Sequence, residues 1–329
     1  MCHDPGVVLA SGVRIGWADL PERVRSAVEG IIGGGAVVEA RSQPGGFSPG
    51  TADRVRTCTG RRAFVKAVSR ELNEQSPELH RREAHVTAAL PATVPAPRLL
   101  GCYDDAIWVA LVLQDVDGHH PATSWRPQEL TRVLAALADL ARAAIPDPLA
   151  DLPTAAQSLA DDFGGWRRVA TDPPPDLDPW VARHLDELCA LADRAMAALA
   201  GDSLVHTDIR ADNLLLDSHG TVTVVDWPWT CRGPAWLDRL LLLINVRLFG
   251  GHDTQALLNQ CAADTDAESA DLIATLAAFG GYFADRARRP SPAGLPTVRA
   301  FQQAQADVVR SWLQEVGRVR SAAKRGFGI

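Results

Sequence analysis

The pattern of apolar and polar positions changes character near residue 118. Before that point, short apolar or alternating runs are separated by turns that contain Gly and Pro, which is typical of β-strands. Apolar positions at helical spacing predict one helix over 19–32, and good start signals predict another over 76–90. The predicted strands cover 36–41, 51–58, 63–68 and 108–113.

From residue 127 onward the pattern is helical. The predicted helices cover 128–144, 178–200, 236–248, 270–286 and 298–320, and Pro-rich segments interrupt them. The order of elements therefore predicts an α+β fold with a β-rich first part and a larger, mostly helical second part.

One segment in the helical part carries side chains suited to phosphoryl transfer. Residues 206–213 read HTDIRADN, and Asp226 lies in the later run TVTVVDW. Such a transfer needs a held acceptor hydroxyl and cations that neutralise the phosphates. The offsets fit a kinase arrangement in which Asp208 accepts the hydroxyl proton while Asn213 and Asp226 hold magnesium.

The residues around this segment predict how the three groups meet. Apolar runs at 214–216 and 222–225 flank a polar turn at 217–220, which predicts a hairpin with Asp226 at its exit. His206 is expected to hold the loop by hydrogen bonds. Arg210 either stabilises charge on the transferred phosphoryl group or forms a surface salt bridge.

This segment resembles the catalytic core of the aminoglycoside phosphotransferase family, whose members are protein-kinase-like small-molecule kinases. The resemblance implies a bilobal fold with an antiparallel sheet in the small lobe. Residues 1–118 would form the nucleotide-binding lobe with the hinge, and residues 119–329 the helical lobe with the catalytic loop and acceptor site. It also implies that the chain uses ATP or GTP with Mg²⁺.

The resemblance requires a strand lysine and a helix glutamate upstream. Lys66 lies in an apolar run, and it is one of only 2 Lys beside 31 Arg. Ser76 is predicted as the N-cap of the next helix, with Pro77 at its first position. Glu83 is the preferred partner for Lys66, because Glu78 is better explained as an anion at the helix N-terminus.

Two backbone segments complete the expected nucleotide site. A Gly-rich turn at 44–50 lies two strands before the lysine, and its residues Gly46, Phe47 and Ser48 are expected to cover the phosphates. The stretch after the strand 108–113 resembles the family's hinge. There the Gln114 carbonyl and the Val116 amide would bind the base.

The region after Asp226 favours a small-molecule acceptor. A helix follows within about a dozen residues, so there is no room for the activation segment of a protein kinase. Asp238, at the start of that helix, is expected to be a structural anchor. The acidic pair Asp161 and Asp162 and the aromatic Trp227 are the candidates for contact with the acceptor.

Charge and composition narrow the partners. The net charge of −7 divides into −1 for residues 1–120 and −6 for the rest, which argues against nucleic acid and favours a cationic acceptor. Neither a signal peptide nor a membrane-spanning run is recognisable. Six scattered cysteines favour reduced thiols and a cytoplasmic location. The oligomeric state is left open.

Three functions fit these residues. The first is phosphorylation of an aminoglycoside or a related antibiotic. The second is metabolic phosphorylation of a sugar, an amino sugar or an amino alcohol. The third is nucleotide-dependent regulation without catalysis, which Asp208 argues against because a regulator would have no need of a base.

Overall fold

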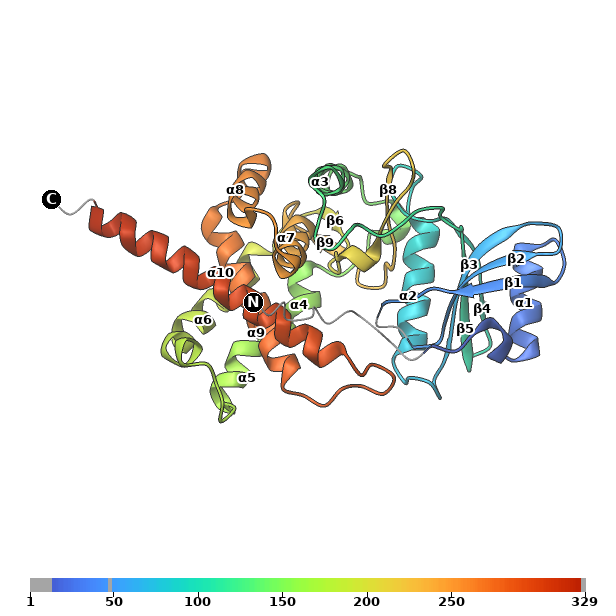
Figure 1. Cartoon of the computed structure of the whole chain (residues 1–329), viewed down its shortest axis with the longest axis horizontal. Helices are drawn as coiled ribbons and strands as arrows, with labels where there is room; N and C mark the ends of the chain where they lie inside the picture. The colour runs from blue at the N-terminus through green and yellow to red at the C-terminus, as the bar shows by residue number, and fades with distance from the viewer. Residues whose placement is uncertain (1–13, 47–48, 327–329) are drawn as a thin grey trace, which may run out of the picture.

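The computed structural model describes residues 14–46 and 49–326, with side chains through residue 317. Figure 1 shows two lobes along the long axis, a small one built on a sheet and a larger helical one. The sheet is antiparallel with strand order β1-β2-β3-β5-β4. Its strands are β1 (Val37–Ser42), β2 (Thr51–Thr57), β3 (Arg62–Ser69), β4 (Leu99–Asp104) and β5 (Trp108–Leu113).

Two helices cover opposite faces of this sheet. Side chains alternate between the faces of a strand. In β3, Ala63, Val65 and Ala67 therefore pack with apolar residues of α1 (Glu22–Ile32). The intervening positions, including Lys66, face α2 (Ser76–Ala89), which contacts β3, β4 and β5. The strand period thus turns Lys66 toward the helix that carries Glu83.

The start of α2 differs from the sequence prediction. The N-cap position is occupied by Gln75, and Ser76 is the first helical residue. The side chain of Asn73 accepts hydrogen bonds from the amides of Gln75 and Ser76 at 3.1 and 3.0 Å. Asn73 therefore satisfies these amides, which are the donors that a helix start leaves open.

The large lobe is a bundle of helices around an extensive apolar core. The helix α9 contacts α5, α6 and α10 along its length. The helices are α3 (Pro127–Ala141), α4 (Ala155–Phe163), α5 (Gly165–Thr171), α6 (Pro179–Ala198), α7 (Leu237–Phe249), α8 (Thr254–Thr265), α9 (Ser269–Ala287) and α10 (Val298–Gly326).

Two small sheets lie where this bundle meets the small lobe. The strands β7 (Leu214–Leu216) and β8 (Val222–Val224) form the predicted hairpin, while β6 (Ser203–Val205) pairs with β9 (Cys231–Gly233). The hairpin is also joined to the end of the hinge, because His119 and Leu216 exchange backbone hydrogen bonds of 2.9 and 2.8 Å. These strands carry the loops that hold the predicted catalytic residues.

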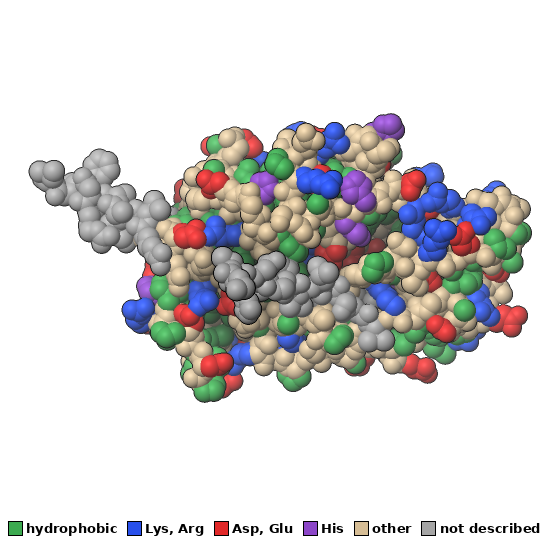
Figure 2. All heavy atoms as spheres, in the orientation of Figure 1, with side chains coloured by type: hydrophobic (Ala, Val, Ile, Leu, Met, Phe, Trp, Pro, Cys, Tyr) green, Lys and Arg blue, Asp and Glu red, His purple; other side chains and the backbone are tan. Residues whose placement is uncertain are grey.

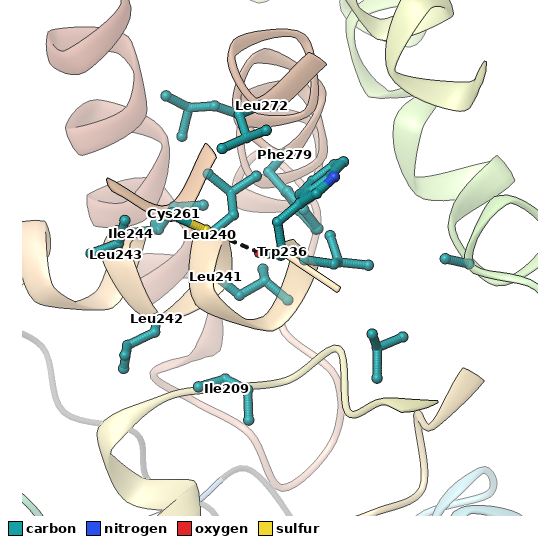
Figure 3. Packing of buried hydrophobic residues seen from close by; sticks show 14 of the residues in the cluster. Ile209, Trp236, Leu240, Leu241, Leu242, Leu243, Ile244, Cys261, Leu272 and Phe279 are labelled. Carbon is teal, nitrogen blue, oxygen red and sulfur yellow. Dashed lines mark hydrogen bonds between the residues drawn. The ribbon is translucent and has the colours of Figure 1, made fainter. Parts of the chain in front are cut away.

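The helix α7 links the core to these loops. Ten of its thirteen residues are buried, so it is apolar on nearly all sides, which is typical of a central helix. Figure 3 shows leucines of α7 in the core and Ile209, from the loop after β6, beside the same helix. Ile209 is 1% exposed. Its burial fixes the loop that contains Asp208 and Arg210.

Candidate active site between the lobes

A cleft of about 960 Å³, including its open mouth, lies between the lobes. In Figure 2, acidic side chains are visible in the hollow between the lobes. Among the predicted site residues, those that line the cleft are Gly46, Lys66, Glu83, Gln114, Val116, Asn213 and Asp226.

Lys66 joins the two lobes at the back of the cleft. Its ammonium contacts the carboxylate of Glu83 and lies 2.7 Å from Oδ1 of Asp226. Burial opposes the charged form, but the two carboxylates more than offset it and raise the pKa of Lys66. The predicted pairing with Glu83 is confirmed, whereas Glu78 pairs with Arg81 at 3.5 Å.

Asp226 stays ionised in this arrangement. Burial alone would raise its pKa, but the Lys66 ammonium and, more weakly, the Arg210 guanidinium together outweigh burial and lower the pKa to about 2. Its backbone has φ of 70°, a left-handed conformation that is uncommon for a residue other than glycine. Such strain is typical of functional sites, and here it is found in the residue that follows the hairpin.

The predicted base lies in a buried ion-pair network. Oδ1 of Asp208 is 2.5 Å from Nη1 of Arg210, and Arg210 also binds Asp212 at 3.0 Å. Burial raises the pKa of Asp208 to about 7, although the Arg210 guanidinium opposes this shift. The Arg210 side chain is only 13% exposed, so the surface salt bridge considered from the sequence is ruled out. It lies against the base itself.

Asp238 and Asn245 of α7 hold the backbone of this loop. The carboxylate of Asp238 accepts hydrogen bonds from the amides of His206 and Thr207, both at 2.8 Å. The side-chain oxygen of Asn245 accepts from the amide of Ala211 at 3.2 Å. The predicted anchoring role of Asp238 is confirmed, while Asn245 has no signal in the sequence beyond its place in an apolar helix.

His206 connects the loop to the residue before Asp226. Its Nδ1 accepts from the amide of Asp208 at 3.2 Å, so its Nε2 carries the proton and donates to the Val225 carbonyl at 3.0 Å. Burial lowers the pKa of His206 to about 4, which keeps the ring neutral. The predicted hydrogen-bonding role of His206 is confirmed.

Asn213 and Asp226 fit the requirements of a magnesium ion. The amide nitrogen of Asn213 donates to the backbone and side chain of Asp208 at 2.8 and 3.0 Å, which directs its Oδ1 away from the base. Asp226 adds an ionised carboxylate in the same cleft. Magnesium prefers oxygen ligands and often takes one or two from protein and the others from phosphates and water.

The Gly-rich turn closes the cleft from the small lobe. Gly45, Gly46 and Gly50 all have positive φ, and a Cβ on Gly50 would lie 2.3 Å from the Ala67 carbonyl. Only glycine fits such a close approach of two backbones. Gly46 lines the cleft as expected, and Phe47 and Ser48 lie outside the described residues.

Ion pairs join the hinge to the sheet. Asp115, which is 4% exposed in its side chain, binds Arg54 of β2 and Arg62 of β3, each at 2.6 Å. Figure 2 shows basic side chains gathered on the small lobe. The Gln114 carbonyl and the Val116 amide form no hydrogen bonds with the rest of the described chain, and both residues line the cleft. Their proposed contact with the base stays a prediction.

The expectation for Trp227 is wrong. Trp227 is 0% exposed, its indole donates to the Val224 carbonyl at 2.8 Å, and its ring packs against His206. It cannot contact an acceptor because the core surrounds it. Trp229, two residues later, is 45% exposed, and its carbonyl accepts a hydrogen bond of 2.8 Å from Thr207. The exposed indole is therefore the one beside the catalytic loop.

The acidic pair lies near the base but is already paired. Arg286 binds Asp161 at 3.2 Å and Asp162 at 2.9 Å. Asp161 is 76% exposed in its side chain and Asp162 only 25%. Burial raises the pKa of Tyr282 to about 12, and Asp162 and Asp208 both contribute, so this ring lies within electrostatic reach of both carboxylates.

Comparison with known families gives these residues a context. A family model described as the phosphotransferase enzyme family, APH, matches residues 45–273. The chain belongs to this phosphotransferase family. The matched range of the phosphotransferase includes Lys66, Glu83, Asp208, Asn213 and Asp226. No curated protein gave a match to the sequence.

Solved structures share the fold of this phosphotransferase. An aminoglycoside phosphotransferase from Alicyclobacillus acidocaldarius is 16% identical, with a TM-score of 0.57 over 91% of this chain and 96% of that one. APH(4)-Ia in complex with ADP and hygromycin B is 17% identical, with a TM-score of 0.57 over 88% and 98%. Choline kinase LicA from Streptococcus pneumoniae is 10% identical, with a TM-score of 0.56 over 88% and 98%. At these identities the likeness shows the kinase-like fold alone.

Within the described residues, no helix of the phosphotransferase combines the length and apolar character needed to cross a membrane.

Proposed function

We propose that this chain transfers the γ-phosphoryl group of ATP or GTP to a hydroxyl group of a small molecule. The observation that carries the proposal is the convergence of Lys66, Asp208 and Asp226 from three separate elements around one cleft. Lys66 and Asp226 are in contact at 2.7 Å, and Asp208 is held through Asn213, which lines the same cleft. This is the set of groups that nucleotide-dependent phosphoryl transfer requires.

Each residue has a distinct role in the proposed reaction. Asp208 accepts the proton of the acceptor hydroxyl. As it does so, the hydroxyl oxygen bonds to the γ-phosphorus, and the bond between the γ-phosphorus and the β-phosphate oxygen breaks. Lys66 binds the α- and β-phosphates, and Glu83 keeps its ammonium in place. Arg210 orients Asp208 and places a cation beside the reacting oxygen.

Asn213 and Asp226 are the residues that would hold Mg²⁺. When bound, the ion neutralises charge on the β- and γ-phosphates. APH(4)-Ia has been crystallised with ADP, which supports the assignment of this cleft to a nucleotide.

For the acceptor we propose an alcohol that also carries a cationic group, with an aminoglycoside or a related antibiotic as the first candidate. Besides burial, two carboxylates, Asp162 and Asp208, raise the pKa of the Tyr282 ring, and the guanidinium groups of Arg286 and Arg210 oppose them. These two carboxylates would bind the cationic group of the acceptor. The named substrates of the structural relatives, hygromycin B and choline, support this class.

A metabolic amino alcohol or amino sugar is the second candidate. The observation that favours it is the pairing of both Asp161 and Asp162 with Arg286, which reduces the negative charge available to a polycation. A substrate with a single amino group needs fewer carboxylates.

The test is a Mg²⁺-dependent screen of ATP and GTP against aminoglycosides, other hydroxylated antibiotics, sugars and amino alcohols, followed by product mass. Asp208→Asn is run in parallel, with Asp202→Asn as the control because the Asp202 side chain is 93% exposed. A product that gains one phosphate, is lost in Asp208→Asn and is retained in Asp202→Asn supports the proposal. Binding of ATP without any product from the wild-type chain would favour a regulator.

A further inference from the structure

Arg14 occupies a place in the cleft for which the kinase arrangement assigns no residue. It lies in the segment before α1, and its side chain lines the cleft together with Lys66 and Asp226. Its Nη2 donates to the carbonyl of Gly45 at 2.7 Å. The guanidinium therefore contacts the turn that is expected to cover the nucleotide phosphates.

The backbone around Arg14 is fixed to the sheet. The Ile15 amide donates to the Gly50 carbonyl at 3.3 Å. The amide of Trp17 donates to the buried carboxylate of Asp53 at 2.6 Å, and Asp53 is 1% exposed. These two hydrogen bonds join the residues that follow Arg14 to the start of β2, and they therefore fix the position of Arg14.

The Arg14 side chain fits against the turn because residue 46 is a glycine and has no Cβ. A Cβ on Gly46 would lie 3.1 Å from Nη2 of Arg14, so the guanidinium packs directly on the glycine. Gly46 has φ of 75°, a second reason for glycine at that position. The turn and the arginine are therefore fitted to one another.

The position of Arg14 relative to Asp226 indicates what it could bind. Burial lowers the pKa of Arg14, and the carboxylate of Asp226 is the strongest opposing influence, so the guanidinium lies within electrostatic reach of Asp226. Asp226 is one of the two proposed magnesium ligands, and such an ion would neutralise charge on the β- and γ-phosphates.

We propose that Arg14 is a phosphate-binding residue that contacts the β- or γ-phosphate of the nucleotide. The inference rests on the proposed function, because it assumes that this cleft holds a nucleoside triphosphate. A guanidinium presents five N–H donors in a planar fork that matches phosphate oxygens, so one side chain can hold the turn and a phosphate together. Proline has no backbone N–H, so Pro49 cannot donate an amide hydrogen bond to a phosphate at the end of the turn. The Arg14 guanidinium would supply a donor in its place.

The experiment measures the affinity of the wild-type chain and of Arg14 variants for Mg-ATP, Mg-ADP and adenosine by calorimetry. We expect Arg14→Ala to lose about 10- to 100-fold in Mg-ATP affinity, the range for a lost hydrogen bond to a charged group, while adenosine affinity is unchanged. Arg23→Ala is the matched control, because Arg23 is half exposed and pairs with Asp105 outside the cleft. It should bind all three ligands as the wild type does.

Two further variants separate phosphate binding from support of the turn. Arg14→Lys keeps the positive charge. Arg14→Gln removes the charge but keeps an N–H donor for the Gly45 carbonyl. Recovery of Mg-ATP affinity by Lys but not by Gln, at equal melting temperatures, supports phosphate contact. Equal recovery by both, or an unchanged affinity in Arg14→Ala, overturns the inference and leaves the proposed function standing. Failure of the wild-type chain to bind either Mg-ATP or Mg-GTP overturns both.

Discussion

The proposed catalytic half of the site and its proposed acceptor half are built in different ways. In the catalytic half, Asp208 and Asn213 come from one short loop, and α7 fixes that loop by hydrogen bonds and by buried Ile209. In the acceptor half, Asp162 and its partner Arg286 are 124 residues apart and meet only because α4 packs against α9. The first half is local in sequence and the second is not.

The difference shows which part of the molecule tolerates change. A loop held by buried polar contacts has one arrangement, since each lost contact leaves an unsatisfied group. Exposed ion pairs on helices contribute little to stability and can be exchanged. The same catalytic half can therefore serve different acceptors when the helices of the large lobe change.

Asp208→Asn should have the largest effect on the catalytic half. We expect transfer to fall on the order of 10³-fold, within the range for loss of a general base. Asn retains the size of Asp208 but cannot take a proton. The measurement is single-turnover product formation with saturating Mg-ATP.

Nucleotide affinity should stay within error of the wild type, because Asp208 is not among the residues that line the nucleotide cleft. A variant that retains a tenth or more of the wild-type rate would show that another group takes the proton, and the assigned base would be wrong.

Asp238→Ala should affect both stability and catalysis. Asp238 is 4% exposed and accepts two amide hydrogen bonds, so its loss leaves two buried donors unsatisfied. We expect the free energy of unfolding to fall by about 2 to 4 kcal/mol. We expect kcat to fall on the order of 10- to 100-fold because the base moves. Chemical denaturation and steady-state kinetics measure the two effects.

Asp238→Asn is the control for this prediction, since it keeps an acceptor for one of the two amides. It should lose about half the stability that Ala loses. An unchanged kcat in the Ala variant would show that contacts within the loop hold the base in place. The helix α7 would then contribute only apolar packing.

The pH dependence of transfer should report the titration of Asp208. Burial raises its pKa to about 7, and only the ionised carboxylate can accept a proton. The rate should therefore fall about tenfold for each pH unit below 7, where an unperturbed aspartate would give a flat profile down to about pH 4. Single-turnover rates between pH 5 and 8.5 provide the measurement.

Two other buried carboxyl groups must be distinguished from it. Burial also raises the pKa of Glu83 and of Asp238, to about 7 and about 6. Protonation of Glu83 would weaken Mg-ATP binding, so affinity is measured over the same pH range. A flat rate profile with a sloping affinity profile would assign the titration to Glu83 instead of Asp208.

The contrast between the halves also explains what the sequence could predict. The hairpin β7–β8 followed from two apolar runs around a polar turn. The pairing of Lys66 with Glu83 and the anchoring by Asp238 rested on the family resemblance and on the places of Glu83 and Asp238 in their helices. All three are confirmed. The small lobe was predicted except for β4, whose residues lack a clear apolar alternation.

The errors arose where distant segments meet. Trp227 and Trp229 are two residues apart, and only tertiary packing decides that the first is buried and the second exposed. Arg14 lies in no motif. Its position in the cleft depends on hydrogen bonds that Trp17 and Ile15 donate to Asp53 and Gly50. The helices α4 and α5 were missed because such short segments carry little periodic signal, and α8 was missed because its apolar residues do not gather on one helical face.

Asp162→Asn should have the smallest effect, and it tests the acceptor half alone. If the acceptor carries a cationic group near Tyr282, its KM should rise about 3- to 10-fold, the scale of a partly exposed ion pair, while the KM for nucleotide is unchanged. Asp161→Asn is the matched control, because the Asp161 side chain is 76% exposed and shares the same partner, Arg286. A KM that falls in Asp162→Asn, or one that rises equally in both variants, would contradict a cationic group at Asp162. The negative field of this half would then serve only to hold Arg286, and the acceptor would be recognised by shape, with the exposed indole of Trp229 as the nearest surface to examine.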